Sequence, residues 1–364
     1  MAFETKRLVW IAALLGALFP RAEADCLAPN KTQTISVLPN FTPGVKWQIE
    51  IQHTIDVTKP LVPKDALVWD IDLYHVQRHP EIISYLRSNI KDVVILCYVN
   101  AGLAQTSDCD FETVWQSPAY KGLLGGTYPD QNYQGEFWVD IRNRTARDLI
   151  KERITLAQRL GCDGVDPDNI DAFEQKVNGQ DVTGWNLTAA DYVPFVHELA
   201  AHAHSLTTAR GHTLLIGQKN APTILASISA ALDFAVLEDC ADAAHAPHSR
   251  PFCAAFAGAY ARAGKPVFSI AYTPSLGGSD TSAVWGKGRC LAAGASAAEF
   301  AAEAEAEAGD AWLGKLSSVL KLLGGDVELN GCTQYCGEGP GRDVVDTAVN
   351  GQLDMDVCKP VEGM

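Results

Sequence analysis

The stretch Gly161-Cys-Asp-Gly-Val-Asp-Pro-Asp-Asn-Ile-Asp171 places four aspartates within nine residues, directly after a helical pattern and a short apolar segment. Pro167 cannot donate a ladder hydrogen bond and disfavours helix at the residue before it, so we expect a strand to end here with its carboxylates facing a cleft. A carboxyl group beside another carboxylate has a raised pKa and can donate a proton near neutral pH. The alternatives are an Asx-rich turn or a calcium loop, but the central Gly and terminal Glu of an EF-hand are missing.

Apolar segments rich in β-branched and aromatic residues recur on both sides of this stretch. The candidate strands are 47–51, 67–73, 93–99, 137–141, 162–166, 214–219, 234–238 and 267–272, and helical periodicity covers 81–89, 145–160, 189–208, 222–231 and 251–263. Alternation of helices with eight strands predicts an α/β fold, a parallel (β/α)8 TIM barrel. The long polar and Gly-rich segment 104–135 is expected to form a lid or a cleft wall.

The composition changes after Tyr272. A Gly/Ser/Thr stretch and an Ala/Glu tract make 275–315 an expected insertion, and the amphipathic pattern of 312–323 predicts a helix that closes the barrel. We therefore expect a barrel domain at 25–336 and a loop-like C-terminal tail, 337–364, held by disulfides.

The first 24 residues have the form of a signal peptide, with Lys6 and Arg7 before the apolar run 8–19 and a small-x-small site at 22–24. The apolar run is too short for a permanent membrane span, although an uncleaved anchor is the alternative. We expect a secreted, extracellular protein with no membrane segment after cleavage. Ten cysteines remain, so several disulfides are expected, with their connectivity open. Glycosylation sequons agree with secretion and begin at Asn30, Asn40, Asn143 and Asn186.

The chain is acidic, with a formal net charge of −15. The signal segment holds three basic and two acidic residues, a net +1, so the mature chain carries −16. Such a charge argues against a nucleic-acid partner and favours either solubility or a cationic ligand.

Polar residues close nearly every candidate strand. Because the active site of a parallel barrel lies at the carboxyl ends of its strands, we expect these side chains to meet. Carboxylates beside aromatic rings are typical of a carbohydrate site, in which a pair of carboxylates performs glycoside hydrolysis. Lys219 could form a Schiff base, but an ion pair with neighbouring carboxylates is the stronger expectation. For Asp70 and Asp72, a structural ion pair with Arg142 or Lys219 is an equal alternative.

No nucleophile elbow, dinucleotide fingerprint or His-Glu-x-x-His motif occurs in the chain. His202 and His204 lie two residues apart on one expected helix and point to different faces, so they are poor joint metal ligands. We therefore expect neither a cofactor nor a metal.

Several segments together resemble one known family, in order along the chain: 47–51, 54–57, 68–74, 97–102, 138–142, 161–169, 216–220 and 238–240. They are similar to glycoside hydrolase family 114, the secreted endo-α-1,4-polygalactosaminidases, which fold as (β/α)8 barrels. The resemblance implies that Asp168 and Glu238 are the catalytic pair and that Cys240 and Cys253 form a disulfide. Three positions depart from the family pattern: Asp166 and Ala271 stand where the family usually has Glu, and Asn100 where it has Ser.

The sequence and the resemblance together predict a monomeric hydrolase of α-1,4 links in a galactosamine-rich, cationic polysaccharide. Asp168 is the expected nucleophile and Glu238 the expected general acid/base. The residues expected to position the sugar are Asp72, Tyr98, Asn100, Asp140, Asp166, Asn169, Lys219 and Tyr272. Two alternatives stay open: an inactive barrel that binds cell-wall or coat glycans, and a glycosidase for a neutral α-galactan, suggested by Ala271.

Overall fold

The computed structural model describes residues 38–51, 54–59, 61, 65–129, 133, 135–240, 252–272, 316–321, 333–335, 345–346, 348–349 and 352–353. The expected signal peptide, 1–24, and the expected insertion, 275–315, lie outside these residues. No helix in the described ranges is long and apolar enough to cross a membrane.

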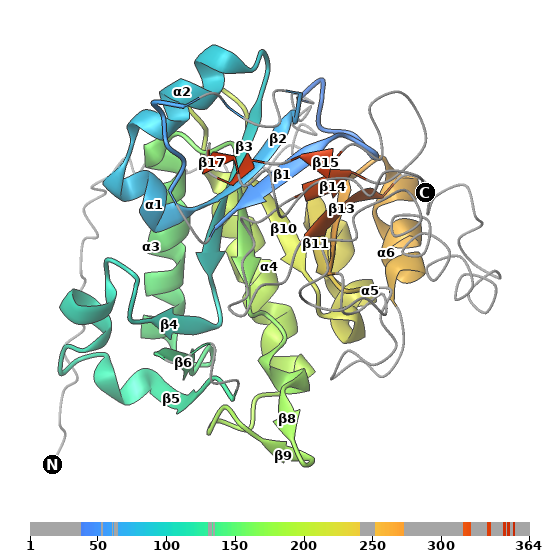
Figure 1. The fold of residues 1–364 in the computed structure, drawn as a ribbon. Coiled ribbons are helices and arrows are strands. Elements are labelled where there is room, and N and C mark those ends of the chain that lie inside the picture. Colours follow the sequence, from blue (N-terminus) through green and yellow to red (C-terminus); the bar gives the residue numbers. More distant parts are fainter. Residues whose placement is uncertain are drawn as a thin grey trace, which may run out of the picture. The chain divides into compact units, whose positions relative to one another are not determined.

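The main sheet contains eight parallel strands followed by two antiparallel ones (Figure 1). In their spatial order the parallel strands are β1 (Trp47–Glu50), β2 (Val68–Asp72), β3 (Val94–Asn100), β7 (Gly164–Asp168), β10 (Leu215–Lys219), β11 (Phe234–Glu238), β12 (Val267–Tyr272) and β13 (Ser317–Lys321). Cα atoms of β13 approach those of β1 to within 8 Å, so the parallel sheet is nearly closed into a barrel. The (β/α)8 prediction is confirmed in its architecture.

One predicted barrel strand is wrong. The segment 137–141 forms β6 (Glu136–Val139), which pairs antiparallel with β4 (Leu103–Gln105) and β5 (Leu124–Thr127) in a separate small sheet. In the barrel, β3 pairs directly with β7 instead. The sequence of a short apolar segment can predict a strand but not the strand with which it pairs. The sequence of 137–141 therefore could not show whether it belongs to the barrel.

The eighth strand comes from a segment predicted to be helical. Residues 317–321 of the expected helix 312–323 form β13, which pairs with β12 from Phe268–Ser317 to Tyr272–Lys321. The barrel edge left open by β12 offers a full row of backbone hydrogen bonds, which outweighs a weak amphipathic pattern. The strand β14 (Thr333–Tyr335) follows near the end of the expected barrel domain. The described part of the expected loop-like tail also contains short strands: β15 (Val345–Asp346), β16 (Ala348–Val349) and β17 (Gln352–Leu353).

Strand β7 differs from expectation at its end. It continues through Pro167 to Asp168. Its ladder with β10 covers only Gly164 and Val165, so Pro167 lies beyond that ladder, while β3 pairs along the whole of β7. The missing N–H of proline is therefore tolerated inside the strand.

Helices lie outside the sheet, mostly where periodicity predicted them (Figure 1). They are α1 (Leu73–Arg78), which was not expected, α2 (Glu81–Asn89), α3 (Arg144–Leu160), α4 (Ala189–Ser205), α5 (Leu225–Ile228) and α6 (Cys253–Ala259). Shorter turns are η1 (Phe111–Trp115), η2 (Lys121–Leu123), η4 (Ala172–Glu174), η5 (Pro222–Ile224), η6 (Ser229–Ala231) and η7 (Ala261–Ala263). Two caps explain the limits of α3: the Asn143 side chain accepts from Thr145 N, and Gly161 ends the helix at φ +100°.

Two apolar clusters hold the barrel together. One fills its interior and includes Trp47, Phe234 and Phe268, whose rings are in contact. The other lies between the strands and the helices. The Cys97–Cys162 disulfide joins β3 to the second residue after α3, and both of its cysteines are fully buried. The disulfide Cys240–Cys253, implied by the family resemblance, is present.

Candidate active site

Every parallel strand ends on a polar residue, and these ends share one edge of the barrel. In spatial order they are Glu50, Asp72, Asn100, Asp168, Lys219, Glu238, Tyr272 and Lys321. The small sheet β4–β6–β5 and the hairpin β8 (Lys176–Val177) with β9 (Gln180–Asp181) lie at the lower side of Figure 1, the side toward which β3 runs.

Three of these strand ends share a backbone feature. Directly after Asp168, Lys219 and Glu238, the chain adopts a positive φ, at Asn169 (+60°), Asn220 (+41°) and Asp239 (+49°). Asn and Asp tolerate this left-handed conformation better than most residues. Each strand therefore stops abruptly, with Asp168, Lys219 or Glu238 as its last residue.

Lys219 connects the two expected catalytic carboxylates. Its Nζ lies 3.2 Å from Asp168 Oδ1 and 3.5 Å from Glu238 Oε2. The lysine side chain is only 4% exposed, whereas Asp168 and Glu238 are 19% and 23% exposed. The carboxylates thus face solvent above a buried ammonium group, and the expected ion pair of Lys219 is confirmed.

Hydrogen bonds fix Asp168 further. Tyr98 Oη donates to Asp168 Oδ2 at 2.7 Å, and the backbone N–H of Asn169 donates to Oδ1 at 2.8 Å. Burial alone would lower the pKa of Lys219, but Asp168 and Glu238 outweigh it and raise the pKa well above its ordinary value. Burial, then the charge of Asp168, raises the pKa of Tyr98 in the same way. Both donors therefore keep their protons, and Asp168 has the surroundings of an anion.

Asp166 lies two residues before Asp168 on β7, so both side chains point to the same face of the strand. The carboxyl group of Asp166 lies near that of Asp70 on β2. Both residues are 0% exposed, and the two carboxyl groups are close enough to act on each other's ionisation. Burial, then the charge of Asp166, raises the pKa of Asp70 well above its ordinary value. Burial raises the pKa of Asp166 to about 7, although Lys219 opposes the shift. The salt bridge considered for Asp70 is not formed, because Lys219 pairs with Asp168 and Glu238.

The other two aspartates of the opening stretch have different surroundings. Asp163, at the other end of the barrel, is fully buried and contacts Arg87, Arg210 and His212. Asp171 directly precedes the short turn η4. Asp163 is therefore a structural residue of the barrel.

The end of β3 is fixed by a close backbone contact. The amides of Ala101 and Gly102 donate to the Asp168 carbonyl at 3.0 and 3.2 Å. A Cβ at Gly102 would lie 1.9 Å from the carbonyl oxygen of Asn169, so only glycine fits. Asn100 Oδ1 accepts from Leu103 N and from Asn169 Nδ2, which makes Asn100 a support for Asn169.

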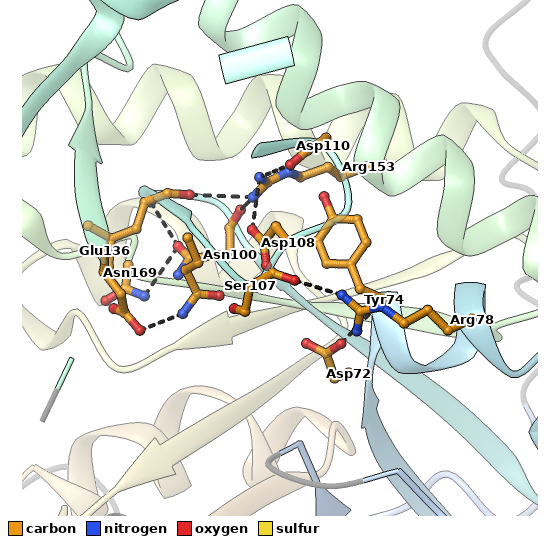
Figure 2. A network of polar contacts seen from close by, with 12 residues as sticks. Asp72, Tyr74, Arg78, Asn100, Ser107, Asp108, Asp110, Glu136, Arg153 and Asn169 are labelled. Atoms are coloured by element: carbon orange, nitrogen blue, oxygen red, sulfur yellow. Dashed lines mark hydrogen bonds and ion pairs between the residues drawn. The ribbon is translucent and has the colours of Figure 1, made fainter. Parts of the chain in front are cut away.

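A buried arginine holds the loop beyond β3 (Figure 2). Arg153 Nη2 lies 3.0 Å from Asp108 and 2.8 Å from Asp110, and its Nη1 donates to the Asn100 carbonyl at 2.7 Å. The Arg153 guanidinium also stacks over the Tyr74 ring. This network fixes the small sheet to the barrel edge, because it joins the loop to both β3 and α3.

Two expected sugar-binding residues have structural partners. Asp72 Oδ1 accepts from Tyr74 N and His75 N, and so caps α1. Asp140 follows β6 in the small sheet and binds Arg142 through both carboxylate oxygens. The reason for expecting Asp140 in the cleft was its barrel strand, which is wrong. Sugar contacts by Asp72 and Asp140 stay predictions, as they do for Tyr272, of which the structure describes only the backbone.

The small sheet supplies residues that sequence reasoning did not single out. Glu136 on β6 is held by Gln105 on β4, and burial raises its pKa to about 7, with a contribution from the charge of Asp168. Figure 2 shows Glu136 and Asn169 at the same edge of the polar network. Burial and the charges of Glu238 and Glu136 raise the pKa of Tyr133, and Tyr128 contacts Tyr133 edge-on. Tyr128 and Tyr133 belong to the segment 104–135, and the prediction that this segment forms a lid or cleft wall was the sequence signal that could have identified them.

In the described residues, no three His, Cys, Asp or Glu side chains are grouped so as to hold a metal ion. The residues brought together are instead two solvent-facing carboxylates, a buried ammonium, a tyrosine hydroxyl and nearby aromatic rings. This set can deliver a proton to a glycosidic oxygen on one side and attack or stabilise the anomeric carbon on the other.

A parallel barrel with a carboxylate pair at its carboxyl edge is an arrangement typical of glycoside hydrolases. The model of glycoside-hydrolase family GH114 matches residues 28–340, and the chain belongs to this family.

Among solved structures, the chain is similar to Aspergillus fumigatus Ega3 in complex with galactosamine. The two are 27% identical with a TM-score of 0.59, over 82% of this chain and 97% of that chain. The glycoside hydrolase domain of PelA from Pseudomonas aeruginosa is 13% identical, with a TM-score of 0.48 over 76% of this chain and 93% of that chain. No match was found among curated protein sequences.

Proposed function

We propose that the protein is a secreted endo-hydrolase of α-1,4 links in galactosamine-containing polysaccharide, with Asp168 as nucleophile and Glu238 as general acid/base. The observation that carries the proposal is the Lys219 ammonium between the two carboxylates. It holds them at one barrel edge, exposed to the same solvent space.

The roles follow from the partners of each carboxylate. Asp168 receives hydrogen bonds from Tyr98, Lys219 and the backbone of Asn169. Three donors suit an ionised carboxylate that attacks the anomeric carbon. Glu238 has the longer contact to Lys219 and the greater exposure. It is the better placed of the two to exchange a proton with the leaving oxygen and then with water.

The separation of the pair favours retention of anomeric configuration. Because Lys219 Nζ touches both, Asp168 Oδ1 and Glu238 Oε2 lie at most about 6.7 Å apart, the sum of the 3.2 and 3.5 Å contacts. Retaining enzymes have carboxyl groups about 5–5.5 Å apart, and inverting enzymes about 6.5–9.5 Å. The upper limit of about 6.7 Å on the separation excludes nearly all of the range found in inverting enzymes.

A cationic sugar fits the electrostatics of this edge. The chain carries a formal net charge of −15, and Asp70, Asp166, Asp168, Glu136 and Glu238 all belong to the site or border it. Such a field attracts partly deacetylated galactosamine and stabilises the positive charge that develops at the anomeric carbon. The bound galactosamine in the Ega3 structure supports the same substrate class.

The test is product analysis by mass spectrometry after incubation with partly deacetylated α-1,4-galactosaminan. Wild-type protein should release oligomers, whereas Asp168→Asn and Glu238→Gln should release none while still binding the polymer. Glu152→Gln, an exposed change on α3, is the matched control and should behave as wild type. Binding without products from the wild type would favour the inactive glycan-binding barrel. Cleavage of a neutral α-galactan alone would favour the neutral substrate.

A further inference from the structure

Asp70 and Asp166 form a carboxyl pair with no other hydrogen-bond donor. None of their four oxygens receives a hydrogen bond from an N–H or O–H group in the described part of the chain. Both residues are fully buried, and the two carboxyl groups are close enough to act on each other's ionisation. Two neighbouring buried carboxylates without donors would repel strongly, and a proton held between them removes that repulsion.

The pair has a defined place in the barrel. Asp70 on β2 and Asp166 on β7 flank β3, where they are registered with Leu96 and Tyr98. Leu96 belongs to the apolar cluster of the barrel interior. Asp168 is two residues further along β7, toward the solvent. The pair therefore lies between the apolar interior and the catalytic carboxylates.

The ionisable groups that act on Asp166 come from three other strands and from β7 itself. They are Asp70 on β2, Lys219 on β10 and Glu238 on β11, and Asp168 follows on β7 itself. Only Lys219 is a cation, and it also acts on Asp70. The buried ammonium thus interacts with Asp168 and Glu238 above and with the Asp70–Asp166 pair below.

We propose that Asp70 and Asp166 hold one proton between them and act as positioning residues, whose single negative charge fixes the Lys219 ammonium beneath Asp168 and Glu238. With the lower charge in place, Lys219 is attracted from both sides and remains between the carboxylates. Without it, the ammonium is free to follow Asp168 or Glu238 alone, and the geometry of the pair loosens. The catalytic consequence rests on the function proposed above, whereas the shared proton does not.

The shared proton is tested without substrate. Infrared spectra of protein with isotope-labelled aspartate, recorded at pH 6, should contain a protonated carboxyl band that is lost in Asp70→Asn, because the Asn amide then donates to Asp166 in place of the proton. Asp140→Asn, which removes an Arg142-bound carboxylate, should leave the band intact. Absence of the band in the wild type, or its persistence in Asp70→Asn, would overturn the proposal.

The positioning role is tested by comparing charge with shape. Asp70→Asn keeps one negative charge on Asp166, while Asp70→Asn with Asp166→Asn keeps the shape and removes the charge. The double variant should lose at least about tenfold more kcat than Asp70→Asn, with KM within about threefold and an unchanged or higher Tm, since a buried charge has been removed. Equal kcat in the two variants would overturn the role. If the wild type does not cleave the polymer, the infrared result still decides the shared proton.

Discussion

Replacing Lys219 with Met removes the only charge that separates Asp168 from Glu238 in the described contacts. At a separation of at most about 6.7 Å and an effective dielectric constant of about 20, two bare carboxylates repel by at least about 2.5 kcal/mol. The lysine side chain is 4% exposed, so water replaces it poorly. A barrier increase of this size lowers the rate by about 70-fold.

We therefore expect Lys219→Met to lower kcat/KM by about two orders of magnitude. Met fills the lysine's volume but leaves Asp168 and Glu238 without their buried cation, so the Tm should also fall. The assay is reducing-end release from the galactosaminan between pH 4 and 9, with a thermal melt of each variant.

Lys219→Arg is the informative control. It keeps the charge, but its planar fork cannot replace a point charge at 3.2 and 3.5 Å from two carboxylates. Partial activity is expected. A Lys219→Met variant within threefold of wild type at every pH would refute the bridging role.

Three further changes test other parts of the site. Tyr98→Phe removes the 2.7 Å hydrogen bond to Asp168, worth roughly 1.5–3 kcal/mol, so initial rates should show kcat/KM about 10- to 100-fold lower; unchanged rates would contradict this. Glu136, whose pKa is about 7, carries its charge above neutral pH, so Glu136→Gln should raise KM for the deacetylated polymer several-fold at pH 8, little at pH 6, and not at all for the acetylated polymer. Burial opposes the ionisation of Asp163, but His212, Arg87 and Arg210 hold its pKa below the ordinary value. The ionised Asp163 therefore stabilises the fold above about pH 4, and this contribution is lost as the pH falls further. Thermal melts of Asp163→Asn should lack this acid-dependent fall in Tm.

The barrel strands were predictable where the hydrophobic pattern of a segment reflects its burial in the fold. β11 and β12 have the expected limits, because continuous apolar residues bounded by polar ones mark a strand buried on both faces. The same signal misled at 137–141, where β6 is half-buried in a small antiparallel sheet. At β13 the signal was absent, because Ser317-Ser-Val-Leu-Lys321 becomes a strand only beside β12.

The residues of the site that end barrel strands were predictable, whereas the buried Asp70–Asp166 contact and Glu136 were not. Asp168, Lys219 and Glu238 follow from the rule that barrel strands end at the active site, and the structure brings them together. The Asp70–Asp166 contact depends on the register of β2 and β7 across β3, which no single segment encodes. Glu136 was overlooked because it enters the site from outside the barrel.

The left-handed residues Asn169, Asn220 and Asp239 suggest how such an enzyme can be remodelled. Each marks the point at which a barrel strand ends, and the side chain proposed for the site lies just before it. Loops grafted or lengthened after these junctions would change which polymer binds while leaving Asp168, Lys219 and Glu238 in place. Library design for new glycan specificities should therefore randomise the loops downstream of the junctions and keep the three junction residues fixed.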